Sequence, residues 1–476
     1  MKKLITISED LNDETTRINI MKLTKCEYIN YLSGVCKINV IVGVMALLFT
    51  FCNTVKAVEN NYPEELLNIE LFTKGKIKVG DKITAENVDV VKDLLDPVAY
   101  IQVKTMGRVI DIVESTTDVT KLFPHEYLQA TLKNEGKAHF DEAGNVVTES
   151  GDRWIGGNPF PNAKTAEEVM ANLTLSWGRH DQSVYAMRDW DIGPDGNVQY
   201  QYDLVWAEMN AAGLVNGDSP YMIAKAHDDK LRYQSVFFTY PNDTKGTSFL
   251  NTWYADQNAF PDLYGYLPAF KRVRRFPSNQ RFEPLVPGMT FFLSDAWASG
   301  DPMLTWGNYK IVSRGPFLGG VSKNFHGEHE NWEPGVHGGP QGKTFFDTNM
   351  ELLPDVMVIE AEPTGFPRAP VGKKRIYVDM RNSMYIGYVT YDRRGEIWKS
   401  FHPVYSQYID GNQTIMDGEH PVWSWTSVMS HDIQTNRMTR FAQVKEVKGG
   451  YKTSYNMGSE IYTKYLTVQA IRRLGR

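Results

Sequence analysis

The stretch IGYVTYDRRGEIWKSF, residues 386–401, holds two apolar segments separated by Asp-Arg-Arg-Gly at residues 392–395. Aspartate favours the start of a turn because its carboxylate accepts backbone N–H groups, and glycine favours the end because it tolerates positive φ. The pattern therefore predicts a strand, a tight turn and a second strand. The same signature recurs in KAHFDEAGNVVTE (137–149) and in RDWDIGPDGNVQYQYDLVW (188–206). Three such hairpins favour a fold dominated by antiparallel strands.

Other segments have the length and composition of strands. They are rich in β-branched and aromatic residues and are bounded by turn-forming residues. These segments are Lys230–Tyr240, Gly246–Ala255, Asp355–Pro363, Lys374–Met380 and Asn436–Val444. The proline-punctuated stretches 276–288 and 360–372 are expected to be loops.

Two stretches have the pattern of helices. Ile83–Leu95 has apolar residues on one face, with Thr84 as the expected N-cap and Asp96-Pro97 as the expected end. Lys164–Leu175 carries a capping box, in which Thr165 and Glu168 satisfy each other's backbone N–H groups. With so few helices, we expect an α+β fold that is mostly β: a large curved antiparallel sheet covered by a few helices, or a partial barrel.

The first 57 residues differ from the rest. Lysines at 22, 25 and 37 precede the apolar run Ile38–Phe51, and Val55 and Ala57 are small enough for a signal-peptidase site. This pattern predicts a secretory signal, since the run is short for a membrane-spanning helix. An uncleaved anchor remains an alternative, and translation could start at Met1 or Met21. We therefore expect a leader at 1–57 and a single domain at 58–476, in which 58–163 supply an N-terminal helix and hairpin segment and 164–476 supply the main sheet.

All three cysteines, Cys26, Cys36 and Cys52, lie in this leader, so residues 58–476 offer no thiolate nucleophile or thiolate metal ligand. A lipid-modified Cys52 is disfavoured because FTFC lacks small residues before the cysteine. The leader has seven Lys/Arg and five Asp/Glu, which leaves 44 against 52 and a net charge of −8 for the remainder. A negative balance argues against nucleic acid as a partner.

Signals for catalysis and metal binding are weak. The chain lacks a Gly-x-Ser-x-Gly elbow, an H-E-x-x-H helix and a P-loop, so we expect no enzyme, no catalytic residue and no cofactor. The loop 324–340 holds His326, His329 and His337 among three glutamates, but its spacing matches no metal signature, and a solvated loop is the favoured interpretation. The pair Asp189/Asp191 could bind calcium or exchange protons, although surface turn chemistry is favoured for it too.

Aromatic residues stand at 12% and concentrate in Phe249–Phe270. A sheet rich in Trp and Tyr suits a pocket that needs apolar bodies with polar tips, as well as ordinary core packing. The candidate ligand-binding residues are Trp253, Tyr254, Tyr264, Tyr266, Phe270, Arg272 and Arg274.

The basic stretch YLPAFKRVRRFP (266–277) is expected to be a strand. Period-two alternation places Arg272 and Arg274 on one face and Lys271, Val273 and Arg275 on the other. We expect Arg272 or Arg274 to pair with an Asp or Glu of a neighbouring strand.

Four segments, in order, resemble the domain-of-unknown-function 1329 family of exported proteins from Gram-negative bacteria. They are ITAENVDVVKDLL (83–95), GGNPFPNAKTAEEVMANL (156–173), YLPAFKRVRRFP (266–277) and KKRIYVDMRNSMYIGYVTYDRRGEIWKSF (373–401). The likeness runs from about Lys76 to the C-terminal region. The last two segments also resemble wider relatives of the lipoprotein carriers LolA and LolB. The long leader and the His-rich insert depart from the family pattern.

The resemblance implies an unclosed barrel with helices over its concave face and an apolar cavity between them. It also implies a periplasmic protein, associated with the outer membrane, that holds or moves lipid-like molecules. A non-enzymatic carrier for a hydrophobic ligand is the preferred hypothesis. The alternative is an assembly component that docks on an outer-membrane protein or an exporter. The sequence does not specify the ligand, the protein partner or the oligomeric state.

Overall fold

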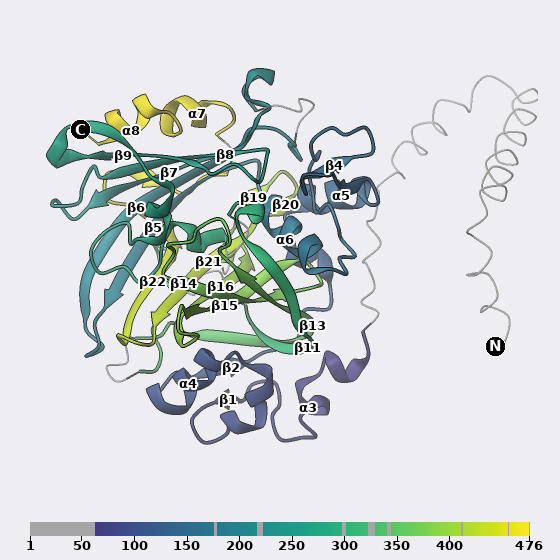
Figure 1. The fold of residues 1–476 in the computed structure, drawn as a ribbon. Helices are drawn as coiled ribbons and strands as arrows, with labels where there is room; N and C mark the ends of the chain where they lie inside the picture. The colour runs from purple at the N-terminus through teal and green to yellow at the C-terminus, as the bar shows by residue number, and fades with distance from the viewer. Residues whose placement is uncertain are drawn as a thin grey trace, which may run out of the picture. The chain divides into compact units, whose positions relative to one another are not determined.

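The computed structural model describes residues 62–175, 179–216, 222–297, 301–321, 329–339, 344–410, 413–455 and 457–475. The expected leader lies outside these residues. The described chain is built around one sheet of fifteen strands (Figure 1). Fourteen strands follow the order β1-β2-β13-β14-β15-β16-β21-β22-β5-β6-β7-β8-β9-β10, and β11 pairs mainly with β13. All but two of the strand pairings are antiparallel, which confirms the expected fold class.

The strands of this sheet have the following bounds: β1 (Lys82–Ile83), β2 (Ile110–Ile112), β5 (Gln182–Ile192), β6 (Val198–Asn210), β7 (Lys230–Tyr240), β8 (Ser248–Tyr254), β9 (Asp262–Leu267), β10 (Arg272–Phe276), β11 (Gly307–Val321), β13 (Thr348–Glu362), β14 (Val371–Asp379), β15 (Met384–Asp392), β16 (Ile397–Gln407), β21 (Trp423–Asp432) and β22 (Arg437–Val444). The helices are α3 (Ile69–Phe72), α4 (Pro97–Met106), α5 (His125–Asn134), α6 (Ala166–Leu175), α7 (Glu460–Tyr465) and α8 (Val468–Leu474). No described helix is long and apolar enough to cross a membrane.

The three predicted hairpins are confirmed. The 386–401 stretch forms β15 and β16, with Gly395 at φ 84° and the Asp392 carboxylate accepting the backbone N–H groups of Arg394 and Glu396. The 188–206 stretch forms β5 and β6. The 137–149 stretch forms the separate hairpin of β3 (Ala138–Phe140) and β4 (Val146–Thr148). Local turn chemistry therefore sets the register of these pairs.

One predicted helix is confirmed and the other is wrong. In α6, the Thr165 hydroxyl accepts the N–H of Glu168, and the Glu168 carboxylate accepts the N–H of Thr165, as a capping box requires. The 83–95 stretch instead forms the end of β1 and the 3-10 helix η2 (Val88–Leu94). Asp96-Pro97 does not end a helix: the Asp96 carboxylate caps the start of α4. Helices α4 and α5 were not predicted.

Each face of the sheet is covered by different parts of the chain. One face of the sheet packs against α6, through Val169 and Met170, and against the segment that contains Phe292. We call this face the inner face. The alternate side chains form the outer face. Near β13 and β14 this face is covered by the N-terminal segment and α4, and near β5–β7 by α7 and the C-terminal residues. Figure 1 shows α7 and α8 on one side of the curved sheet, α4 on the opposite side, and α6 between them.

Candidate functional site

A segment without sheet hydrogen bonding lies across the inner face. We call Pro284–Trp297 the strap. Prolines at 284 and 287, and Gly288 at φ 97°, keep its first half from forming regular structure, and the short 3-10 helix η7 (Leu293–Trp297) follows. Its side chains Met289, Phe291 and Phe292 are buried in the same cluster as the inner-face residues. The strap thus fills the space where the resemblance implied an open apolar cavity.

Polar contacts hold the strap to the sheet at its middle. The Tyr202 hydroxyl donates to the Pro287 carbonyl at 2.8 Å. The Thr290 N–H donates to the Thr439 hydroxyl at 2.8 Å, and the Thr290 hydroxyl lies 3.1 Å from that of Ser430. The Thr290 hydroxyl also donates to the Ser430 backbone carbonyl at 2.9 Å. Each of these contacts uses a side chain of the sheet or of the strap, so separating them would leave the strand ladder intact.

Two buried lysines of the sheet face the strap. Lys374 on β14 forms an ion pair with Asp295 at 2.8 Å, and Lys399 on β16 donates to the Thr290 carbonyl at 2.5 Å. The β14–β15–β16 register aligns both lysines with Thr390 in one row. Desolvation lowers the pKa of Lys399 to about 8. The two lysines of the inner face therefore contact the strap through one carboxylate, that of Asp295, and one backbone carbonyl, that of Thr290.

Aromatic rings surround these ammonium groups. Lys374 Nζ lies 4.3 Å from the ring centroid of Tyr388, and Lys399 Nζ lies 3.6 Å from that of Phe292. Cation–π contacts of this kind partly replace lost hydration. The site combines apolar bodies with buried positive charge.

A second buried ion pair lies beside the strap. Arg281 and Asp301 are both fully buried and paired, and Arg281 also donates to the Asn251 amide oxygen at 2.6 Å. The Trp253 indole N–H donates to Asp301, and its ring lies 5.1 Å from the Arg281 guanidinium. Trp253 is thus part of the inner face.

The carboxylates of Asp189 and Asp191 also face the strap. Both side chains are fully buried, so surface turn chemistry was the wrong interpretation. Gly288 lies so close that an added Cβ would be 2.7 Å from Asp191 Oδ2. Burial and the neighbouring Asp191 raise the pKa of Asp189 well above its usual value, and burial raises the pKa of Asp191 to about 7. Burial therefore favours the protonated form of both carboxyl groups.

Several buried polar atoms of this region have no hydrogen-bond partner among the described residues. They are Asp189 Oδ1 and Oδ2, Asp191 Oδ2, Ser294 Oγ, Trp306 Nε1, Gln234 Nε2 and Arg232 Nε. Each such atom costs free energy, typically about 1–3 kcal/mol. Unsatisfied groups clustered on one face are unusual for a core that serves stability alone.

The structure does not bring the predicted ligand-binding residues together. Trp253 lies on the inner face. Tyr254, Tyr264 and Tyr266 alternate to the outer face, where Tyr266 contacts Gly475. Phe270 is 51% exposed, and Arg272 and Arg274 are exposed on β10. Whether any of the seven residues contacts a ligand stays a prediction.

The prediction that Arg272 or Arg274 forms an ion pair with a neighbouring strand is wrong, because a different arginine forms it. Arg275 makes the pair, with Asp262 on β9, while Arg274 lies 4.5 Å from the Phe270 ring. The face assignment was correct, because Val273 and Arg275 align with Tyr266 and Tyr264 on one face. The Asp262 side chain lies on the outer face, so it pairs with Arg275, which lies on that face too.

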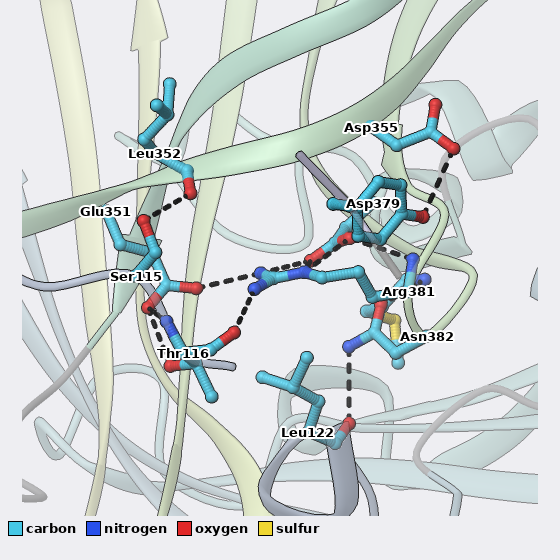
Figure 2. A network of polar contacts seen from close by, with 11 residues as sticks. Ser115, Thr116, Leu122, Glu351, Leu352, Asp355, Asp379, Arg381 and Asn382 are labelled. Carbon is cyan, nitrogen blue, oxygen red and sulfur yellow. Dashed lines mark hydrogen bonds and ion pairs between the residues drawn. The ribbon is translucent and has the colours of Figure 1, made fainter. Parts of the chain in front are cut away.

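A different polar cluster joins the N-terminal segment to the sheet. We call it the Arg381 clamp (Figure 2). The Arg381 guanidinium donates to Asp379 at 2.7 Å, to Glu351 at 2.8 Å and to the Thr116 carbonyl at 2.8 Å. The Thr116 hydroxyl in turn donates to Glu351 at 2.7 Å. The two carboxylates raise the pKa of Arg381, against the effect of its burial.

Two open clefts flank this cluster. One, of about 430 Å³, is lined by the clamp residues and by Asp118, Ser406 and Trp423 among others. The other, of about 600 Å³, lies between α4 and β11 and is lined by Tyr100, Phe317 and Tyr377 among others. The lining of the first cleft is about equally polar and apolar, whereas that of the second is more apolar than polar.

The described part of the His-rich loop forms no metal centre. His326 and Glu328 lie outside the described residues. Glu333 pairs with Arg188, and His337 lies 3.8 Å from Asp347. Across the residues that the structure describes, no three His, Cys, Asp or Glu side chains converge as a metal site would require.

A family model described as a protein of unknown function (DUF1329) matches residues 82–472. The chain belongs to the DUF1329 family. The match covers nearly all of the described residues, in agreement with the resemblance found in the sequence. A search of curated proteins found no significant match.

The chain also matches solved structures at low sequence identity. A domain assigned to outer-membrane lipoprotein sorting, from Vibrio parahaemolyticus, has a TM-score of 0.40 and 17% identity over 65% of this chain and 97% of its own. A DUF1329 protein from Desulfovibrio piger has a TM-score of 0.40 and 14% identity over 62% and 95%. A LolA-superfamily protein from Nitrosomonas europaea has a TM-score of 0.34 and 13% identity over 60% and 96%.

Sequence reasoning missed most of the inner-face site. Lys374 and Lys399 lie inside the very segments that carry the family resemblance, but alternation alone does not mark a lysine as buried. The neighbouring residues could have indicated that these lysines are buried. Ile376 and Phe401, two positions from Lys374 and Lys399, lie on the same face and are apolar. The strap gave no signal beyond its prolines.

Proposed function

We propose that the chain is a non-enzymatic periplasmic carrier for a hydrophobic, lipid-like molecule, and that the ligand binds the inner face in place of the strap. The observation that carries this proposal is the pair of buried lysines, Lys374 and Lys399, directed at a segment held by side chains. Asp295 of the strap then occupies the position that an acidic headgroup would take.

The apolar part of the ligand would replace the apolar side chains of the strap. Phe291 and Phe292 make edge-on or tilted ring contacts with aromatic residues on or near the inner face, namely Phe401, Phe441, Phe282 and Trp398. An acyl chain gains about 0.8 kcal/mol for each buried CH₂ group, and micromolar affinity needs about 8 kcal/mol. An acyl chain of ordinary fatty-acid length therefore has enough apolar surface to compete with the strap for the inner face, even though displacing the strap costs free energy.

The test has two parts. Organic extracts of natively purified protein are analysed by mass spectrometry, and the stripped protein is titrated with fluorescent cis-parinaric acid and with its methyl ester. We expect a co-purified lipid and tighter binding of the acid. The Lys399→Met variant should weaken binding of the acid by about tenfold and leave the ester unchanged, because only the acid can pair with the ammonium group. No lipid and no binding of either probe would refute the proposal.

A second function has one observation in its favour. Strand β11 pairs along its length with β13, and its opposite edge makes one bridge, at Val321, among the described residues. Ile311 and Val312 on this strand are 39% and 40% exposed. Such an edge can accept a strand of another protein, as an assembly component docking on an outer-membrane protein or an exporter would. Crosslinking in cells followed by purification should then yield one stable partner.

A further inference from the structure

The end of the sheet opposite β11 carries a concentration of positive charge. Lys271, Arg272, Arg274 and Arg275 lie on or next to β10, and Arg472 and Arg473 lie on α8. We call these six residues the basic edge; all of them are exposed. Residues 263–282 and 461–476 contain no Asp or Glu, although the whole chain has a net charge of −6. The positive charge is therefore local and opposes the overall balance.

The two parts of the basic edge are neighbours in space. Helix α8 packs across β8, β9 and β10. The Ser248 hydroxyl on β8 donates to the Ile471 carbonyl at 3.1 Å, and an added Cβ on Gly475 would lie 2.1 Å from the Tyr266 ring. Figure 1 shows the C terminus beside β9. The edge of the sheet thus gathers cations from two segments that lie about 200 residues apart in the sequence. Arg272 and Arg274 lie on the inner-face side of β10, and Arg275 lies on the outer side, which α8 covers.

An exposed aromatic residue lies at the tip of this surface. Phe270 ends the short turn between β9 and β10, and it is 51% exposed. Lys271 follows it at φ 52°, and the Arg274 guanidinium lies 4.5 Å from its ring. An aromatic ring surrounded by cations is the arrangement that proteins use at the boundary between lipid headgroups and acyl chains.

Most of these charges have no carboxylate partner among the described residues. Arg275 is paired with Asp262, and Arg473 donates to the backbone carbonyls of Thr463 and Lys464. A protein strand is a poor occupant for this edge, because β10 has only five residues, three of them arginines, and Pro277 follows without an N–H group. A surface of diffuse negative charge fits better.

We propose that the basic edge binds the anionic surface of a lipid bilayer, with Phe270 inserted among the headgroups. This docking is independent of the ligand on the inner face. It would place the carrier against the membrane that supplies or receives its lipid. Each Lys or Arg near an anionic bilayer strengthens partitioning by about fivefold at physiological salt.

The test is sedimentation of the purified full chain with vesicles. One set contains about 30% phosphatidylglycerol in phosphatidylcholine, and the other contains phosphatidylcholine alone. We expect binding to the first set, loss of binding in 0.5 M salt, and a drop of at least tenfold in the Arg272→Glu/Arg274→Glu variant. Phe270→Ser should weaken binding by a smaller factor that does not depend on salt. The control Lys76→Glu/Lys78→Glu makes the same charge change at exposed residues of the N-terminal segment and should bind as the parent does.

Three results would overturn the proposal. They are equal binding to both vesicle types, an equal loss in the control variant, and binding to poly-glutamate but not to vesicles, which would assign the surface to an acidic protein. Circular dichroism confirms that each variant is folded. The assay contains no fatty-acid probe, so its failure leaves the carrier proposal standing, and a failed titration with cis-parinaric acid leaves this one standing.

Discussion

The strap contact and the Arg381 clamp are both buried polar regions that join separate segments to the same sheet, yet they differ in how their polar groups are satisfied. In the clamp, Arg381 donates to Asp379, Glu351 and Thr116, and none of these side chains has an unsatisfied buried atom. In the strap contact, Asp189, Asp191, Ser294 and Trp306 all have buried polar atoms without a partner. Among the described residues, the hydrogen bonds of the clamp are therefore satisfied, whereas those of the strap contact are only partly satisfied.

This difference indicates different roles. A fully satisfied buried network rigidifies a fold, whereas a partly satisfied one is costly to keep. The clamp joins Thr116 of the N-terminal segment to the sheet through hydrogen bonds with Arg381 and Glu351. The strap contact retains groups that a ligand could satisfy, which agrees with a segment that leaves the inner face.

The largest effect is expected from breaking the clamp. Arg381→Met removes the cation that pairs with both Asp379 and Glu351, and it leaves these two buried carboxylates without that partner. Loss of one partner of such a cluster typically costs about 3–5 kcal/mol of unfolding free energy. Urea denaturation measures it. The control is Arg394→Met, which breaks an exposed pair with Asp392 and should change stability little. Equal effects of both variants would mean that the clamp contributes no more than a surface pair.

An intermediate effect is expected from the strap contact, and it depends on pH. The pKa of Asp191 is about 7 in the folded chain, above its value of about 4 in the unfolded chain. The folded state therefore holds the proton more tightly, and its stability falls as the pH rises from about 4 to about 7. Asp191→Asn cannot ionise, so it should match the parent near pH 4 and exceed it at pH 8 by on the order of 2–4 kcal/mol.

Urea denaturation at both pH values checks this expectation. Asp392→Asn is the matched control, because hydrogen bonds from Arg394 lower the pKa of Asp392. Its removal should destabilise the chain at pH 8, with the opposite sign. An Asp191→Asn variant that is less stable than the parent at pH 8 would show that the carboxylate is already satisfied by a contact.

The smallest effect compares two hydroxyl groups. Ser294 on the strap has a buried hydroxyl without a partner, so Ser294→Ala should be neutral or stabilising by up to about 1 kcal/mol. Thr116 in the clamp donates to Glu351, so Thr116→Val should cost about 1–2 kcal/mol. Thermal unfolding of both variants is sufficient. Equal costs would remove the distinction between the two regions.

The sequence predicted the parts of the fold that depend on local chemistry. The Asp-to-Gly turn at 392–395 and the capping box at Thr165 each involve residues a few positions apart, and both formed as expected. The 83–95 helix was wrong. Asp96-Pro97, which was expected to end that helix, instead begins α4, where the Asp96 carboxylate is the N-cap.

The candidate site was less predictable because it depends on contacts across the sheet. Asp191 is buried against Gly288 of the strap, about 100 residues later in the sequence. Lys374 and Lys399 become neighbours through the pairing of three strands. Trp253 was predicted as a candidate because its segment is rich in aromatic residues. Nothing in the sequence indicated its hydrogen-bond partner, Asp301.

The central claim is that a ligand takes the place of the strap. The Oγ atoms of Thr290 and Ser430 lie 3.1 Å apart, so cysteines at these positions can form a disulfide between the strap and β21. The variant Thr290→Cys/Ser430→Cys is made with serine at positions 26, 36 and 52, and cis-parinaric acid is titrated before and after reduction. We predict no binding in the oxidised form and full binding once it is reduced, with Thr290→Cys alone binding in both conditions. Equal binding by the oxidised and reduced double variant would contradict the account.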